Sequence, residues 1–249
     1  LEAALERRRG AHWLVEHKLK RAQRALRWAT WIPFLQAVFI CNTVAFGWPR
    51  WQSDIDVFVV TRRERLWLTR LLMTVAIGLP GYRRHGNKVA NQVCLSFYVT
   101  DDVLDLSPVR MHEDDVLLTY WVLFLYPLYD VAQVAKAVHR LNAWAFARVP
   151  TAPADTLVHP IKSMSPVSLW IKKQLEKVLG GVVGDYLNHW AGQLQKRKMQ
   201  GNTNSVQNAP DSRVVVTDTM LKFHENDRRQ LYREQWQAHS AAARSRLLV

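Results

Sequence analysis

The alternation of apolar and polar positions divides the first half of the chain into helix and strand patterns. From residue 1 to about 30, apolar residues recur near the helical period of about 3.6 residues, with Lys and Arg between them. This pattern predicts a basic amphipathic helix. The runs 34–46, 55–60 and 93–99 are rich in β-branched and aromatic residues, which is typical of buried strands. A shorter apolar run at 104–106 is expected to form a fourth strand.

Helical patterns dominate the remaining chain. They are expected at 62–79, 114–129, 131–146, 168–199 and 220–248. Strands that are followed by a series of helices predict an α/β (α+β) fold, in which a mixed sheet is flanked by helices and a helical C-terminal region follows.

These patterns suggest five segments. They are a basic N-terminal helix (1–30), an α/β domain (31–110), a helical region that includes a proline-rich linker (111–199), a flexible polar loop (200–213), and a charged helical tail (214–249). The sequence begins at Leu1 without an initiator Met, which predicts a fragment or a processed form of a longer protein.

Charge and cysteine content narrow the class of protein. Lys and Arg number 34 against 21 Asp and Glu, so the net charge is +13, which favours polyanionic partners such as nucleic acid, nucleotide phosphates or an anionic surface. Cys41 and Cys94 lie in apolar runs and are expected to be small buried side chains in a reducing compartment. Without a signal peptide or an uninterrupted apolar run of about 18 residues, we expect a cytoplasmic chain with no integral membrane span.

Two acids at the start of the 55–60 strand carry the clearest chemistry. Residues two apart in a strand point to the same face, so Asp54 and Asp56 are expected side by side. Two carboxylates so close repel each other, and a divalent cation relieves that repulsion. Mg²⁺ takes oxygen ligands and completes its shell with water and phosphate. The pair therefore predicts a metal-phosphate site.

The surrounding motifs resemble the nucleotidyltransferase superfamily of the DNA-polymerase-β type. The resemblance covers most of the chain and rests on CNTVAF (41–46), SDIDVFVV (53–60), CLSFYVTDD (94–102) and LKFHENDRR (221–229). More narrowly, the chain is similar to a bacterial group in which this domain follows a winged-helix-like segment. Asn42 and Thr43 stand where the family has a Gly-Ser turn.

The resemblance implies Mg²⁺-dependent (or Mn²⁺-dependent) transfer of a nucleoside monophosphate from a nucleoside triphosphate to a hydroxyl acceptor, which can be a nucleic acid. It places Asp54, Asp56 and Asp105 as catalytic, metal-binding carboxylates. The nucleotide phosphates are expected to meet Asn42, Thr43, Gly47 and Ser53.

Two other classes of function stay open. No acid lies within the 93–99 strand, and the Gly-Ser turn is altered, so an inactive module that binds nucleotide or nucleic acid is one alternative. A peripheral membrane protein is the other, because the N-terminal helix is basic and amphipathic. A basic loop at 82–88 is either a phosphate contact or an exposed turn. Trp48 and Trp51 either cover a ligand or cap the core.

Overall fold

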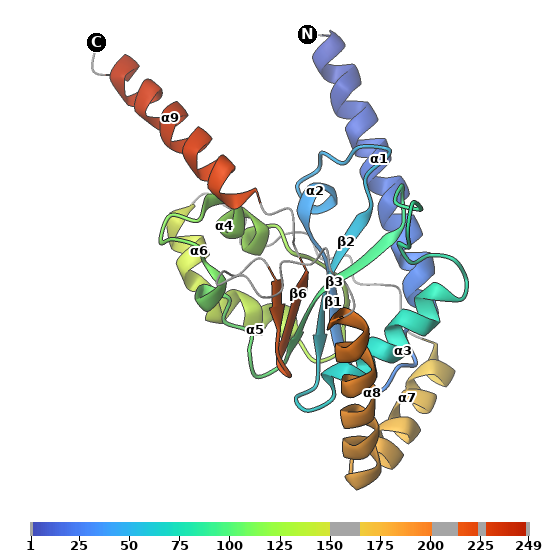
Figure 1. Ribbon diagram of the computed structural model, residues 1–249. Coiled ribbons are helices and arrows are strands. Elements are labelled where there is room, and N and C mark those ends of the chain that lie inside the picture. The colour runs from blue at the N-terminus through green and yellow to red at the C-terminus, as the bar shows by residue number, and fades with distance from the viewer. Residues whose placement is uncertain (1, 150–164, 201–213, 224–227, 248–249) are drawn as a thin grey trace.

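A computed structural model describes residues 2–149, 165–200, 214–223 and 228–247 of the chain. Within these ranges the fold is mixed α/β, as the sequence predicts, with one sheet between two layers of helices (Figure 1). The strands are β1 (Leu35–Ile40), β2 (Ile55–Thr61), β3 (Val93–Thr100), β4 (Tyr126–Asp130), β5 (Val214–Val216) and β6 (Met220–Phe223). The helices are α1 (Glu2–Arg27), α2 (Asn42–Ala45), α3 (Leu66–Gly78), α4 (Val116–Leu123), α5 (Val134–Leu141), α6 (Ala143–Arg148), α7 (Pro166–Leu179), α8 (Val182–Gln200) and α9 (Arg229–Leu247).

In the described part of the chain, the six strands lie in the order β4-β1-β2-β3-β6-β5. The central pair β2 and β3 is parallel, and the other pairs are antiparallel. Alternate residues of β2 enter different cores. Ile55, Val57 and Val59 pack toward α1, α3 and α8, whereas Phe58 and Val60 pack toward α4, α5 and α6. Burial on both faces explains why this strand is almost entirely apolar.

Two strands form where helices are expected. The 114–129 segment divides into α4 and the edge strand β4, which pairs with β1. Pro127 has no backbone N–H to continue a helix, but an edge strand tolerates it. In the C-terminal segment, the apolar residues Met220–Phe223 form β6 beside β3, and the helix begins only at Arg229.

The prediction of a short strand at 104–106 is wrong. Leu104 and Leu106 are buried, but they lie in an irregular segment before the 3₁₀ turn η1 (Ser107–Val109). The buried Asn142 side chain donates to Leu104 O (2.7 Å) and accepts from Leu106 N (2.8 Å). A side-chain amide thus satisfies the backbone groups that a neighbouring strand would otherwise take, while β6 occupies the edge of β3.

Some expected segments lie outside the described residues. They are most of the proline-rich linker (150–164), the polar loop at 201–213 and the motif residues 224–227. The sheet itself combines strands from three of the segments expected separately, namely 31–110, 111–199 and 214–249. The part of the chain at 214–223 is therefore an integral part of the sheet beside β3.

Candidate metal and nucleotide site

The start of β2 presents two acids on one face of the sheet. Asp56 lies on the same side of the strand as Phe58, and Asp54 lies two residues before it. Both carboxyl groups are partly buried, with the Asp54 side chain only 15% exposed. The paired arrangement expected from the sequence is therefore present.

A β-bulge brings Cys94 to these acids. In the parallel pairing, Asp56 lies opposite Cys94 but Phe58 lies opposite Phe97. Between these two pairs, β3 advances by three residues and β2 by two. The extra residue changes which side chains of β3 face the acids. The ligand atoms of Asp54, Asp56 and Cys94 all lie within 4.8 Å of one another, and we call this group the acid–thiol cluster.

Burial and mutual repulsion shift the acid–base properties of the cluster. Desolvation and the charge of Asp54 raise the pKa of Asp56 to about 6, against hydrogen bonds from Asn42 and Cys94 that lower it. Desolvation and the Asp56 charge raise the pKa of Cys94 to about 12. A divalent cation between the carboxylates offsets this repulsion, so the donor set fits a metal ion. The two carboxylates suit a hard cation, whereas a thiol is a ligand that softer metals prefer.

Two cations accompany the cluster on its α1 side. Arg84, from the basic loop after α3, forms an ion pair with Asp54 at 2.6 Å. The buried Lys18 of α1 donates to Ser53 O (2.6 Å) and Asn91 Oδ1 (2.8 Å). Desolvation lowers the pKa of Lys18, and the charge of Asp54 opposes this shift. The basic loop therefore contacts the acids through Arg84, and it is more than an exposed turn.

The Asn42–Thr43 turn lies on the other side of Asp56. Asn42 has φ +55°, in the left-handed region that glycine and asparagine adopt most readily. Its side-chain amide donates to Asp56 Oδ2 at 2.9 Å. Asn42 thus meets the backbone requirement of a glycine position and adds a contact that glycine lacks.

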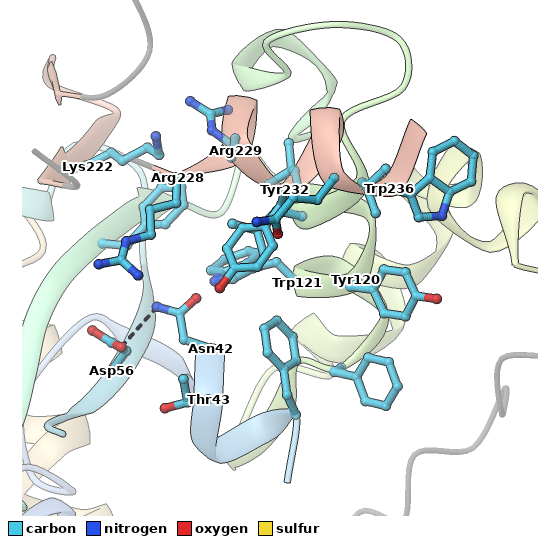
Figure 2. Close-up of a pocket in the computed structure, with 17 residues that line it drawn as sticks. Asn42, Thr43, Asp56, Tyr120, Trp121, Lys222, Arg228, Arg229, Tyr232 and Trp236 are labelled. Carbon is cyan, nitrogen blue, oxygen red and sulfur yellow. Dashed lines mark hydrogen bonds between the residues drawn. The ribbon is translucent and has the colours of Figure 1, made fainter. Parts of the chain in front are cut away.

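A cavity of about 710 Å³ opens beside this turn (Figure 2). Asn42, Thr43 and Asp56 form its polar end. Three cations from β6 and the start of α9 also line it, namely Lys222, Arg228 and Arg229. The remaining wall is largely apolar and comes from α2, β3, α4 and α9: Phe46, Phe97, Val116, Leu117, Leu118, Tyr120, Trp121, Phe124, Tyr232, Gln235 and Trp236.

The charged wall of the cavity is fixed to α4. Arg229 donates to Val109 O (2.6 Å) and to Asp115 Oδ2 (3.2 Å), and both side chains of this ion pair are buried. Asp115 also caps α4 by accepting from Leu118 N at 3.0 Å. In Figure 2, Arg228 extends from the start of α9 toward Asn42 and Asp56. A helix N-terminus and clustered cations favour an anionic ligand.

Asp105, expected to complete the metal site, is not part of the cluster. Its carboxylate is exposed and accepts from Ser107 N and Ser107 Oγ, each at 2.8 Å, so it stabilises the entry to η1. Cys94 stands with Asp54 and Asp56 instead. Because Asp105 follows β3 in an irregular segment, strand alternation does not determine where its side chain points.

The four residues expected to meet phosphate separate into two groups. Asn42 and Thr43 line the cavity. Gly47 and Ser53 do not belong to its lining; Gly47 takes φ +84° after α2, and Ser53 Oγ donates to Arg50 O at 2.8 Å. These two residues shape the loop between α2 and β2.

Sequence reasoning missed the thiol and most of the cavity wall. The sequence pattern predicts that Cys94 is a small buried side chain, and nothing in its own strand indicates a ligand. Lys222, Arg228 and Arg229 belong to a motif that was noted, but no local pattern joins them to Tyr120 or Trp121 more than 100 residues earlier.

Two further findings bear on the kind of protein. Within the described ranges, every helix is too short or too polar to cross a membrane. Comparison with known proteins gives no relative, since no family model, curated protein or solved structure matches the chain.

Proposed function

We propose that this chain is a metal-dependent nucleotidyltransferase, which moves a nucleoside monophosphate from a nucleoside triphosphate to a hydroxyl acceptor. The observation that carries the proposal is the position of Asp56, which belongs both to the acid–thiol cluster and to the lining of the cavity. A metal held at the cluster thus lies at the polar end of a chamber with cationic and aromatic walls. Its volume falls within the range of about 300–1,000 Å³ typical of small-molecule sites.

Different residues of the site bind the metal, the phosphates and the base of the nucleotide. Asp54 and Asp56 hold Mg²⁺ or Mn²⁺, which in this chemistry polarises the phosphate and neutralises its developing charge. Arg228 and the N-terminal end of α9 balance the triphosphate charge. The Thr43 hydroxyl is available to a phosphate oxygen, and Tyr232 and Trp236 provide faces for the base.

The reaction requires position and charge balance more than a covalent intermediate. The acceptor oxygen forms a bond to the α-phosphorus, the bond from that phosphorus to pyrophosphate breaks, and the acceptor proton is released. By holding the triphosphate against cations, the cavity fixes the direction of attack. A reaction that consumes nucleoside triphosphates is consistent with a cytoplasmic location.

One observation favours a second function, an inactive fold that binds nucleotide or nucleic acid without transfer. The cluster supplies a thiol where a third carboxylate is expected, and Asp105 points elsewhere. A protonated thiol is a poor ligand for Mg²⁺, so the site can hold a metal and nucleotide but stabilise the transition state less.

Label transfer separates the two functions. We would incubate the chain with each α-labelled nucleoside triphosphate, Mg²⁺ or Mn²⁺, and a cell extract that supplies acceptors. Wild type is expected to label an acceptor, and Asp54→Asn/Asp56→Asn is expected to abolish the label. Asp105→Asn is the matched control, because it removes an acid outside the cluster, and it should transfer label at the wild-type rate.

Absence of transfer by folded wild-type protein that still binds nucleotide would leave the binding module. Loss of activity in Asp105→Asn equal to that of the double variant would contradict the placement of the site. The same assay with Cys94→Ser tests the thiol, since a hydroxyl keeps the size of the donor and removes its preference for soft metals.

A further inference from the structure

Three aromatic rings stack on the surface of α1, away from the cavity. Trp13 and His17, one helical turn apart, have ring centroids separated by 5.4 Å, and Trp51 stacks on Trp13 at 6.1 Å with 13° between the planes. His17 lies 5.2 Å from Trp51. We call this group the aromatic platform. The stacked rings cover part of one another, yet Trp13 is 58% exposed and Trp51 48% exposed, so considerable aromatic surface meets solvent.

The platform is joined to the acid–thiol cluster through one residue. Lys18, which follows His17 in α1, donates to Ser53 O, and Ser53 lies between Trp51 and Asp54 in the chain. Figure 1 shows the loop from α2 to β2 meeting α1 at this point. A polymer lying across the platform is therefore directed toward the Asp54 side of the cluster, opposite the Asn42 side that opens to the cavity.

Cationic side chains extend the same surface. On α1, Arg9, Lys20 and Arg24 recur at intervals that place them on the face of Trp13. All three are exposed; Lys20 also pairs with Glu16 at 2.6 Å. Arg50 is exposed beside Trp51 in the α2–β2 loop. Glu2, Glu6 and Glu16 share this part of the α1 surface, so acids balance its three cations. The local excess of positive charge comes from Arg50, on a chain whose net charge is +13.

From this combination we infer that the aromatic platform and its flanking cations bind single-stranded nucleic acid. Unpaired bases offer ring faces for stacking on Trp13 and Trp51, and Arg9, Arg24 and Arg50 meet the phosphates. A duplex hides those base faces and fits the platform poorly. This inference rests on the proposed function and specifies its acceptor class, a single-stranded nucleic acid that supplies the hydroxyl.

Fluorescence anisotropy of a labelled single-stranded 20-mer RNA, measured in EDTA without nucleotide, tests the surface. Wild type is expected to bind the RNA, and Trp13→Ala/Trp51→Ala should weaken binding at least tenfold through lost stacking. The matched control is Trp170→Ala, which removes a Trp of α7 that is 63% exposed, and it should bind as wild type does. Trp13→Phe/Trp51→Phe keeps a ring face and should restore most of the affinity.

Charge and strandedness give independent readouts. The aromatic variant should keep the wild-type salt dependence, whereas Arg24→Ala/Arg50→Ala should reduce the slope of log K against log salt by about 2. A duplex of the same sequence should compete at least tenfold less well. Equal binding by the alanine variant and wild type, equal binding of duplex and single strand, or binding of phosphatidylserine vesicles in place of RNA would each overturn the inference.

This experiment is separate from the test of transfer. The anisotropy assay contains neither metal nor nucleotide, so its result does not depend on transfer. RNA binding without label transfer would refute the proposed transfer activity and support the RNA-binding surface. Label transfer to a small acceptor without RNA binding would support the transfer activity and refute the RNA-binding surface.

Discussion

The two flanks of Asp54 and Asp56 use the same residue types in opposite ways. On the α4–α9 flank, aromatic and cationic side chains line a cavity of about 710 Å³, and Lys222 and Arg229 are almost fully buried. On the α1 flank, the aromatic platform and its cations lie open to solvent. A cavity limits the size of its ligand, whereas an open surface accommodates a longer chain. Under our proposals, the small donor binds on the first flank and the polymer on the second.

The two flanks also differ in what holds them. The cavity wall depends on a buried ion pair between α9 and α4, whereas the platform depends on the hydrogen bonds of Lys18 and on ring stacking. Each flank can therefore be tested separately. Three single substitutions follow, two in the cavity wall and one at the acids, in order of decreasing expected effect.

Arg229→Ala breaks the cavity flank and should have the largest effect. It leaves the buried Asp115 carboxylate without its charged partner, which typically costs about 3–5 kcal/mol. Urea unfolding followed by circular dichroism measures the loss. Arg233→Ala is the matched control, because its ion pair with Asp114 (2.7 Å) is partly exposed, and it should cost less than about 1 kcal/mol. Equal losses in both variants would contradict the anchoring role of Arg229.

Asp56→Asn should change how the stability of the protein depends on pH. The folded-state pKa of about 6 exceeds the ordinary 3.8, so the folded protein retains the proton longer and wild-type stability falls as pH rises from about 4 through 6. Without metal, the variant should match wild type near pH 4 and exceed its stability above pH 7 by about 3 kcal/mol. The amide of Asn42 keeps an oxygen acceptor at position 56.

The readout is the unfolding free energy in EDTA at both pH values. Saturating Mn²⁺ should stabilise wild type and leave Asp56→Asn nearly unchanged, because bound ligand stabilises only the protein that holds it. A pH-independent difference between the two proteins would refute the electrostatic account of the cluster.

Trp236→Ala should have the smallest effect and separate the ligands of the two flanks. Removal of a ring from the cavity wall should weaken nucleoside triphosphate binding about tenfold, equivalent to about 1.4 kcal/mol, and leave RNA binding unchanged. Trp13→Ala/Trp51→Ala should show the reverse pattern. Isothermal titration with nucleotide and anisotropy with RNA measure both. If either variant lost affinity for nucleotide and for RNA to the same extent, the two ligands would share one site, and the separation of the two flanks would be refuted.

Much of the architecture was predictable from local patterns. The parallel strands β2 and β3, the basic helix α1 and the paired carboxyls of Asp54 and Asp56 follow from periodicity, because each pattern reports the burial of one element. Asn42 likewise has the left-handed backbone that its place in the turn suggests. The edge strand β4 and the strand β6 were not recognised, since their pairing partners, β1 and β3, are about 90 or more residues away in the chain.

By itself, then, the sequence determined the strands that carry the acids and the residue types available to a metal and to phosphate. Only the tertiary structure decided which of those residues meet. A bulge in β3 brings Cys94 to the acids in place of Asp105, and packing of α9 on α4 closes the cavity with Arg229. The physical reason is that periodicity reports burial along one element, whereas a site depends on register and on contacts between segments far apart in the chain.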